Sequence, residues 1–171
     1  MASEESNNPS ERAALFESYF SVKPEWIDFN GHFNMGYYLV AFDEYATDQY
    51  YDYLGLGQAH KQAAAKTTFT LAANIDYIAE AMQGDELRVT SQLVDFDRKR
   101  LHYIHCMYHA LHGHLIATNE CLGMYIDLAT RKGSVFDESQ LVRFERELLL
   151  CQQHPTPARF ARKLGIRRPA V

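Results

Sequence analysis

The sequence has few features of a secreted or membrane protein. Its 171 residues include three cysteines, Cys106, Cys121 and Cys151, which are widely spaced and form no CxxC pattern. Their odd number and spacing argue against a disulfide framework and a cysteine zinc site, and they indicate a reducing compartment. No stretch approaches the roughly 20 apolar residues of a membrane span, and the polar start MASEESNNPSER does not resemble a signal peptide. We therefore expect a cytoplasmic protein that does not associate with membranes.

The charge balance argues against a general nucleic-acid-binding protein. The formal net charge is -5, so the chain lacks the basic field that nucleic-acid binding requires. With 47% apolar residues, the chain is long enough for one ordinary core. We expect a disordered segment over residues 1–12, a domain over residues 13–154 and a basic tail over residues 155–171.

Histidines are concentrated between residues 102 and 114, at positions 102, 105, 109, 112 and 114. In a strand, His105 and His109 share a face and His102 points the other way. No carboxylate or thiol completes a familiar ligand spacing. We therefore expect no metal site.

Apolar periodicity predicts an α+β protein. An aromatic and β-branched segment over residues 15–27 indicates a strand that bends or lies at an edge near Pro24. Residues 34–55 follow a helical period, with Asn34 as the cap, Gly55 at the end and apolar character on two sides, which is typical of an enclosed helix. After a loop over residues 58–66, strands are predicted at 67–78, 86–96, 100–110 and 114–128, and a helix at 137–153. The short breaks with glycine between these strands predict antiparallel hairpins.

The densest group of polar residues is the segment DFNGHFN, residues 28–34. Alternate side chains of an extended segment share a face, so Asp28, Asn30 and His32 would converge if the segment is a strand. Such a group is suited to catalysis. The alternative is structural, with Asp28 and Asn30 forming Asx turns and Gly31 supplying a positive φ.

The order of one strand, one long helix and a four-stranded meander resembles the hotdog fold, an antiparallel sheet wrapped around one long central helix. PEWIDFNGHFNMGYY and the following AFDEY resemble acyl-CoA thioesterases of the 4-hydroxybenzoyl-CoA thioesterase type, and MYIDLATRKGSVF is similar to the last strand and exit loop of that family. The motifs VKPEWIDFNGHFN, FDRKRLHYIH and ATNE resemble the thioesterases that accompany carnitine dehydrogenase and hydrolyse betainyl-CoA. The matches span about residues 20–137.

This resemblance implies hydrolysis of a small acyl-CoA thioester by a homodimer or a dimer of dimers. Coenzyme A is then part of the substrate, and no other cofactor is implied. The two other functions that fit the resemblance are a hotdog hydratase or dehydratase and a non-catalytic acyl-CoA binding protein.

The resemblance also implies roles for particular residues. The spacing of Asp28, Asn30 and His32 is similar to Asp-x-Asn-x-His in plant acyl-ACP thioesterases, and Glu44 stands where those enzymes carry a helix glutamate. Many bacterial members place an aspartate where this chain has Trp26, so Asp28 or Glu44 is expected to be the principal carboxylate.

The remaining expected site residues bind substrate. Backbone amides from Asn34 to Tyr37 are candidates for the oxyanion site, because they begin the helix. Trp26, Tyr37 and Tyr77 are candidates to face a trimethylammonium group, although core packing is the favoured explanation for each ring taken singly. Basic side chains in predicted loops are candidates to bind the phosphates of CoA, with solvated charge as the alternative: Arg98, Lys99, Arg100, Arg131 and Lys132.

Overall fold

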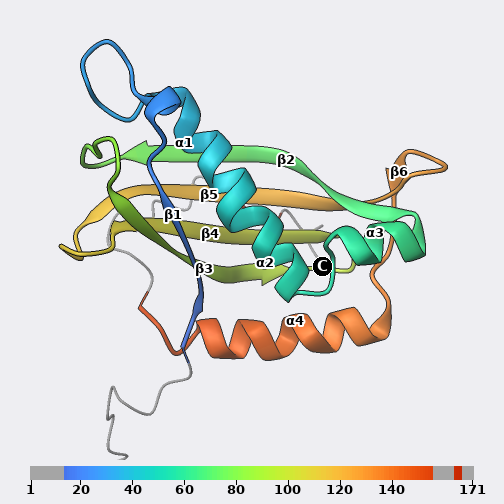
Figure 1. The fold of residues 1–171 in the computed structure, drawn as a ribbon. Helices are drawn as coiled ribbons and strands as arrows, with labels where there is room; N and C mark the ends of the chain where they lie inside the picture. The colour runs from blue at the N-terminus through green and yellow to red at the C-terminus, as the bar shows by residue number, and fades with distance from the viewer. Residues whose placement is uncertain (1–13, 156–163, 167–171) are drawn as a thin grey trace, which may run out of the picture.

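The computed structural model describes residues 14–155 and 164–166. These residues form one six-stranded antiparallel sheet with the order β1-β3-β4-β5-β2, in which β6 pairs with β5 (Figure 1). The strands are β1 (Phe16–Ser21), β2 (Lys66–Tyr77), β3 (Glu86–Phe96), β4 (Arg100–His109), β5 (Leu115–Asp127) and β6 (Lys132–Gly133). The expectations for residues 1–12 and for most of the tail lie outside the described residues.

One long helical segment crosses a face of this sheet, as the hotdog resemblance predicts (Figure 1). It consists of α1 (Met35–Phe42), a π-helical turn (Asp43–Thr47) and α2 (Asp48–Tyr53). The Asn34 side chain caps it by accepting a hydrogen bond from the Gly36 N–H at 2.9 Å, as the sequence predicts. Gly55, with φ of 76°, follows its end.

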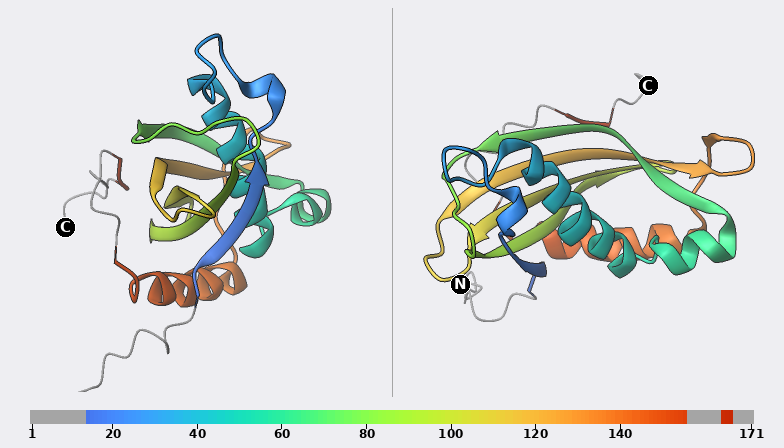
Figure 2. Two further views of the ribbon diagram at one scale, coloured as in Figure 1. Left: turned by 60° about the vertical axis from the view of Figure 1, so that its left-hand side comes forward. Right: turned by 45° about the horizontal axis from the view of Figure 1, so that its top comes forward.

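The last helix, α4 (Glu138–Cys151), lies beside the end of α2 and packs against β3 (Figure 2). Its start is fixed by a capping box, because the Asp137 side chain accepts from the Gln140 N–H and the Gln140 side chain accepts from the Asp137 N–H. This helix therefore begins and ends within two residues of the bounds that the sequence predicts.

Three expectations were wrong. The predicted loop over residues 58–66 contains a short helix, α3 (Gln58–Ala64), as the helix propensity of its alanines and glutamines allows. The predicted strand over residues 15–27 stops at Ser21, and Pro24–Trp26 form a 3₁₀ turn. The break at residues 83–85 does not close a hairpin, because β2 pairs with β5 and the connection crosses the end of the sheet to reach β3.

Aromatic side chains from the long helical segment supply much of the core. Tyr38, Phe42 and Ala46 pack against the sheet in one cluster, and Tyr50 and Leu54 pack in a second cluster with Tyr103 and Phe144. The opposite side of the segment stays exposed in the single chain, since Met35, Leu39 and Val40 have exposed fractions of 68%, 47% and 38%. The single chain therefore encloses one side of this segment, whereas the sequence predicts a helix that is enclosed on two sides.

Within the described residues, no helix has the length and apolar character needed to cross a membrane. The same residues contain no group of three histidine, cysteine or acidic side chains placed to hold a metal ion.

One of the clustered histidines is part of the core. His105 is fully buried, its Nδ1 lies 2.8 Å from Ser91 Oγ, and its Nε2 lies 3.2 Å from Thr47 Oγ1. Burial lowers its pKa from 6.5 to about 3. The folded protein therefore holds this imidazole neutral at pH values where the unfolded chain protonates it.

This difference predicts an acid-sensitive stability. As pH falls from 6.5 towards 3, the unfolded chain binds a proton at residue 105 that the folded chain excludes, so the free energy of unfolding decreases. We expect His105→Gln, which retains a donor and an acceptor, to reduce this pH slope by up to about 1.4 kcal/mol per pH unit. Denaturant unfolding at several pH values measures the slope, and His112→Gln, at an exposed turn, is the control. An unchanged slope in His105→Gln would show that another group titrates.

Candidate active site

The segment that carries Asp28, Asn30 and His32 is a tight turn, not a strand. Asp28 Oδ1 accepts hydrogen bonds from the Asn30 N–H at 2.8 Å and the His32 N–H at 3.4 Å. Gly31 has φ of 84°, which the positive-φ interpretation predicts. Because the turn places alternate side chains differently from a strand, the expected convergence of the three side chains does not occur. Asn30 is exposed and does not line the cavity described below.

The turn is fixed to the core at both ends. Ile27 pairs with Phe33 in a β-bridge, and the Phe33 N–H donates to the Ala81 carbonyl at 2.9 Å. The Asn34 N–H donates to the Trp26 carbonyl, also at 2.9 Å. The segment therefore has the fixed position that a catalytic loop requires.

Asp28 and His32 line an open cavity of about 600 Å³ between the start of α1 and the segment that follows β2. The other lining residues are Phe33, Met35, Tyr38, Tyr77, Ile78, Ala79 and Glu80. His32 Nε2 lies 3.1 Å from Glu80 Oε2, which orients the imidazole within the cavity. Among the described residues, no side chain pairs with the Asp28 carboxylate, which is half-buried at the wall.

The first amides of α1 are not equivalent. The Asn34 N–H donates to the Trp26 carbonyl. The Gly36 N–H donates to Asn34 Oδ1, and the Tyr37 N–H donates to the Asn34 carbonyl. In the described part of the chain nothing accepts from the Met35 N–H, and Met35 lines the cavity that Asp28 also lines. Of the four expected oxyanion donors, Met35 is the one whose amide is available at the positive end of the helix.

Of the three aromatic residues expected to bind substrate, one lines the cavity and two do not. Trp26 is 4% exposed and packs between Phe33 and Tyr37, with ring centroids 5.6 and 6.0 Å away. Lys23 Nζ lies 4.6 Å from its ring centroid. Neither Trp26 nor Tyr37 lines the cavity, whereas Tyr77 does. The core-packing interpretation therefore describes Trp26 in this structure.

Glu44, the helix carboxylate that was expected at the site, does not line the cavity that contains Asp28. Glu44 is exposed, and its nearest basic partner is Lys23 Nζ at 4.0 Å from Oε2. The neighbouring Asp43 lines a separate polar cavity of about 330 Å³ between the helical segment and β2. Burial, followed by the charge of Glu44, raises the pKa of Asp43. The π-helical turn that starts at Asp43 shifts the side chains that follow it away from the regular helical period predicted from residue 34.

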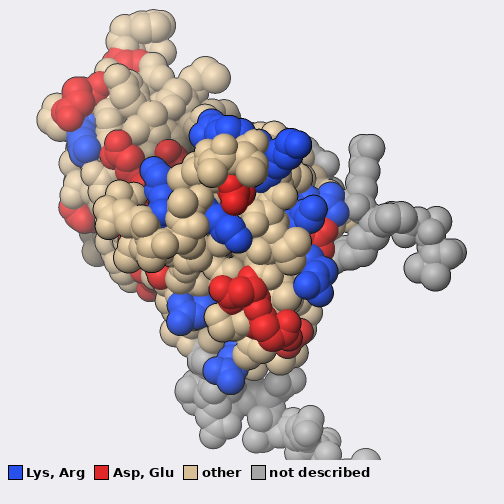
Figure 3. All heavy atoms as spheres, turned by 90° about the vertical axis from the view of Figure 1, so that its right-hand side faces the viewer, with Lys and Arg blue, Asp and Glu red and all other residues tan. Residues whose placement is uncertain are grey.

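The five expected CoA-binding residues lie together, but far from Asp28 in the same chain. Arg98, Lys99 and Arg100 turn from β3 to β4, and Arg131 and Lys132 follow β5. Both turns are at the Lys66 end of β2, about 36 Å from its Tyr77 end for a strand of this length. Figure 3 faces this end of the molecule and shows Lys and Arg side chains over it, with Asp and Glu between them. Arg100 is partly engaged by Asp97, since Nη2 lies 2.6 Å from Oδ2.

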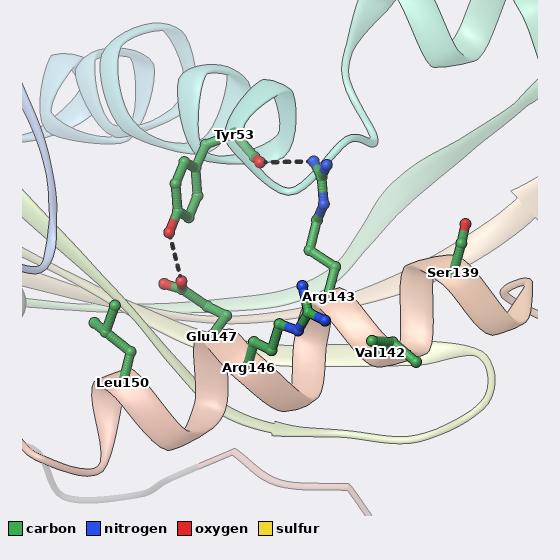
Figure 4. A pocket seen from close by; sticks show the side chains of 7 residues that line it. All are labelled: Tyr53, Ser139, Val142, Arg143, Arg146, Glu147 and Leu150. Atoms are coloured by element: carbon green, nitrogen blue, oxygen red, sulfur yellow. Dashed lines mark hydrogen bonds between the residues drawn. The ribbon is translucent and has the colours of Figure 1, made fainter.

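A further cavity, of about 460 Å³, lies between α2 and α4 (Figure 4). Glu147 lies at its wall with an exposed fraction of 4% and accepts hydrogen bonds from the Tyr50 and Tyr53 hydroxyls, both at 2.8 Å. Arg143 Nη1 donates to the Tyr53 carbonyl at 3.1 Å. These contacts attach α4 to the long helical segment, so this cavity has a structural explanation.

Tyr38 and Glu80 line the cavity although neither was expected to be a site residue. Tyr38 falls on the helical face assigned to the core, and it is indeed 4% exposed. Burial, then the charges of Tyr77 and Glu80, raises its pKa to about 12. Glu80 follows a predicted strand between two alanines, and its only sequence signal is a carboxylate in an apolar segment.

Comparison with known proteins identifies relatives with similar sequences. Residues 22–149 match a family model described as the thioesterase-like superfamily. A betainyl-CoA thioesterase of Pseudomonas aeruginosa is 32% identical over 145 residues, which cover 85% of this chain and 91% of that protein. An L-carnitine dehydrogenase/betainyl-CoA thioesterase of Ruegeria pomeroyi is 35% identical over 112 residues, which cover 66% of this chain but 22% of that longer protein.

A solved structure extends the similarity to the fold. A Staphylococcus aureus protein in complex with CoA superposes with a TM-score of 0.79 and 29% identity, covering 91% of this chain and 98% of that chain. The curled sheet around one long helix is therefore shared over nearly the whole of both chains.

The buried Glu147 carboxylate leads to a stability prediction. We expect Glu147→Ala to lower the free energy of unfolding by about 2–3 kcal/mol, because the buried Tyr50 hydroxyl loses its acceptor and a small cavity forms. Denaturant titration measures the loss. Glu145→Ala, an exposed position on the same helix, is the control and should change stability by less than about 0.5 kcal/mol. Equal effects of the two substitutions would contradict the assigned role of Glu147.

Proposed function

Because this chain belongs to the thioesterase-like superfamily, we propose that it hydrolyses a small acyl-CoA thioester at the cavity lined by Asp28 and Met35. One observation carries the choice of site: the cavity is lined both by Asp28, which is half-buried, and by Met35, whose amide at the helix start is available. Thioester hydrolysis requires a carboxylate that attacks or activates water and a donor for the developing oxyanion. The expected alternatives, a hydratase and a non-catalytic binder, have no comparable support among the relatives.

Three residues of the cavity, Met35, Asp28 and His32, have defined tasks in this reaction. The Met35 N–H donates to the thioester carbonyl oxygen, which becomes negative as the carbonyl carbon turns tetrahedral. Asp28 either takes the proton of the attacking water or attacks the carbonyl carbon itself. When water attacks, collapse of the tetrahedral adduct breaks the carbon–sulfur bond, and the proton taken up by Asp28 returns to the departing thiolate, so the products are the free acid and CoA. When Asp28 attacks, the same collapse leaves a mixed anhydride on Asp28, which water then hydrolyses to the free acid. His32, held by Glu80, orients water or the carbonyl.

The relatives favour one substrate. The similar Pseudomonas aeruginosa protein is a betainyl-CoA thioesterase, and the longer Ruegeria pomeroyi protein joins the same activity to L-carnitine dehydrogenase. We propose betainyl-CoA as the substrate, which places the reaction in carnitine breakdown. The product pair is then betaine and CoA.

We also propose a homodimer that forms along the free edge of β2. Among the described residues β2 pairs only with β5, so its other edge presents unpaired backbone groups. Apolar side chains are exposed along it and on the adjacent helix: Phe69, Leu71, Tyr77, Met35, Leu39 and Val40. An apolar, unpaired edge of this kind favours isologous pairing with a second copy.

Antiparallel pairing of two β2 strands explains the location of the basic residues. The Tyr77 end of one strand then lies beside the Lys66 end of the partner strand. The cavity that contains Asp28 in one protomer would thus adjoin the turns that contain Arg98–Arg100, Arg131 and Lys132 in the other. The CoA phosphates would bind the partner's basic turns while the thioester reaches Asp28.

The catalytic assignment predicts a loss of activity without loss of fold. In Asp28→Asn the amide oxygen still accepts from the Asn30 and His32 N–H groups, so the turn is retained, but the carboxylate is lost. We expect kcat for thiol release from betainyl-CoA to fall about a thousandfold. Thermal unfolding checks the fold.

Glu44→Gln tests the other expected carboxylate with the same assay. Glu44 lies beside Lys23 and does not line the cavity, so we expect this variant to retain most of its activity. A full loss in Glu44→Gln with activity preserved in Asp28→Asn would assign the principal role to Glu44.

The proposed dimer predicts complementation between two defective variants. Asp28→Asn lacks the carboxylate, and the double variant Arg131→Glu, Lys132→Glu lacks part of the phosphate site. If each site uses both protomers, random exchange between the two variants restores an intact site in about a quarter of all sites. Thiol release from the mixture measures the recovery, and each variant alone is the control. No recovery in mixtures shown by mass spectrometry to contain heterodimers would place both groups in one protomer.

A further inference from the structure

We propose that Glu80, Tyr38 and Tyr77 form a subsite that selects acyl groups with a permanent positive charge. This inference rests on the proposed function, because it assigns the acyl end of the same cavity. Tyr77 was expected as an aromatic candidate from the sequence, whereas Glu80 and Tyr38 were not expected to bind substrate. A quaternary ammonium has no hydrogen to donate, so its recognition requires aromatic rings and carboxylates.

Two tyrosine rings meet at the wall of the cavity. The ring centroids of Tyr38 and Tyr77 are 5.2 Å apart with an interplanar angle of 87°, an edge-to-face contact that makes a corner in the cavity wall. Tyr38 is held against Phe33 at 4.1 Å, and the Tyr77 hydroxyl donates to the Met35 carbonyl at 3.0 Å. The corner is therefore fixed by contacts on both sides, and its hydrogen bond attaches it to the start of α1, where the proposed oxyanion donor lies.

The charges of the lining residues favour a cation. Two carboxylates, Asp28 and Glu80, line the cavity, and no lysine or arginine is among its lining residues. His32 Nε2 lies 3.1 Å from Glu80 Oε2, and this contact holds the Glu80 carboxylate at the cavity wall. Glu80 is not the proposed base, so its charge is available for recognition. A negatively charged acyl group would be repelled here.

Glu80 and Tyr77 are accessible in the single chain. The Glu80 side chain is 67% exposed and Tyr77 is 47% exposed. Tyr77 ends β2, the strand whose free edge is proposed to pair with a second copy. Pairing along that edge would partly remove water from the corner and strengthen its attraction for a cation.

A pair of substrates that differ only in charge tests the subsite. Betainyl-CoA carries a trimethylammonium group, and 3,3-dimethylbutanoyl-CoA carries the uncharged tert-butyl group of nearly the same shape. We expect the wild-type protein to favour betainyl-CoA in kcat/KM. Glu80→Gln should reduce that preference about tenfold, and Tyr77→Leu should also reduce it. Glu25→Gln, an exposed carboxylate on the 3₁₀ turn outside the cavity, is the matched control and should leave the preference unchanged.

The outcomes separate the subsite from the proposed function. Hydrolysis of neither ester by the wild-type protein would overturn the proposed function. Equal kcat/KM for both esters would overturn the subsite and leave thioester hydrolysis standing. Equal losses on both esters in Glu80→Gln would show that Glu80 acts only through His32 and would also overturn the subsite. A selective loss on the cationic ester, with unchanged thermal unfolding, supports it.

Discussion

The burial of one aromatic stripe of the long helical segment against a curled sheet is the constraint on which the rest of this structure depends. Tyr38, Phe42 and Tyr50 lie on that stripe, and their packing fixes the position of α1 over the sheet. Because the N-terminus of α1 is fixed in this way, the turn before it also has a fixed position, and Asp28 lines the same cavity as the first free amide. The stripe that stays exposed and the unpaired edge of β2 then lie on the side of the molecule that is available to a second copy.

Asp28 has a structural task as well as its proposed chemical one. Its Oδ1 accepts hydrogen bonds from two backbone N–H groups and closes the turn. The same two hydrogen bonds fix the position of the carboxylate. The structural and catalytic interpretations of this segment are therefore compatible. A carboxylate fixed by backbone donors loses little freedom when substrate binds, which is a general requirement of preorganised sites.

The sequence predicts the hotdog fold and the bounds of its long strands because both depend on local patterns. Alternating and helical apolar periods, the Asn34 cap and the break at Gly133 are all read within a few residues of each element. The pairing of β2 with β5 is a long-range choice that short loops do not reveal. The α3 helix was missed because its sequence lacks a buried apolar face, so only its helix propensity marks it, and propensity alone is a weak predictor.

The candidate site was predicted only in part, because some of its residues come from distant segments of the chain. The heptad of residues 28–34 was found from its density of polar groups, but the cavity also uses Tyr38 and Glu80, which reach it through the packing of α1 against the end of β2. Trp26 was a candidate because an aromatic ring can face a trimethylammonium group, whereas its surroundings in the fold are aromatic rings and Lys23. Contacts between distant segments cannot be deduced from composition or period.

The π-helical turn over residues 43–47 has a consequence for comparing this chain with its relatives. A π turn holds one more residue than a regular turn and advances the following side chains by about 100° around the axis. An alignment that keeps this helix free of gaps would therefore pair residues that face different directions wherever a homologue has an uninterrupted α-helix. In such a homologue the functional counterparts of residues that follow the turn, such as Asp48, would be displaced by one position. For this helix, a structure-based alignment is the sounder basis for assigning equivalent carboxylates.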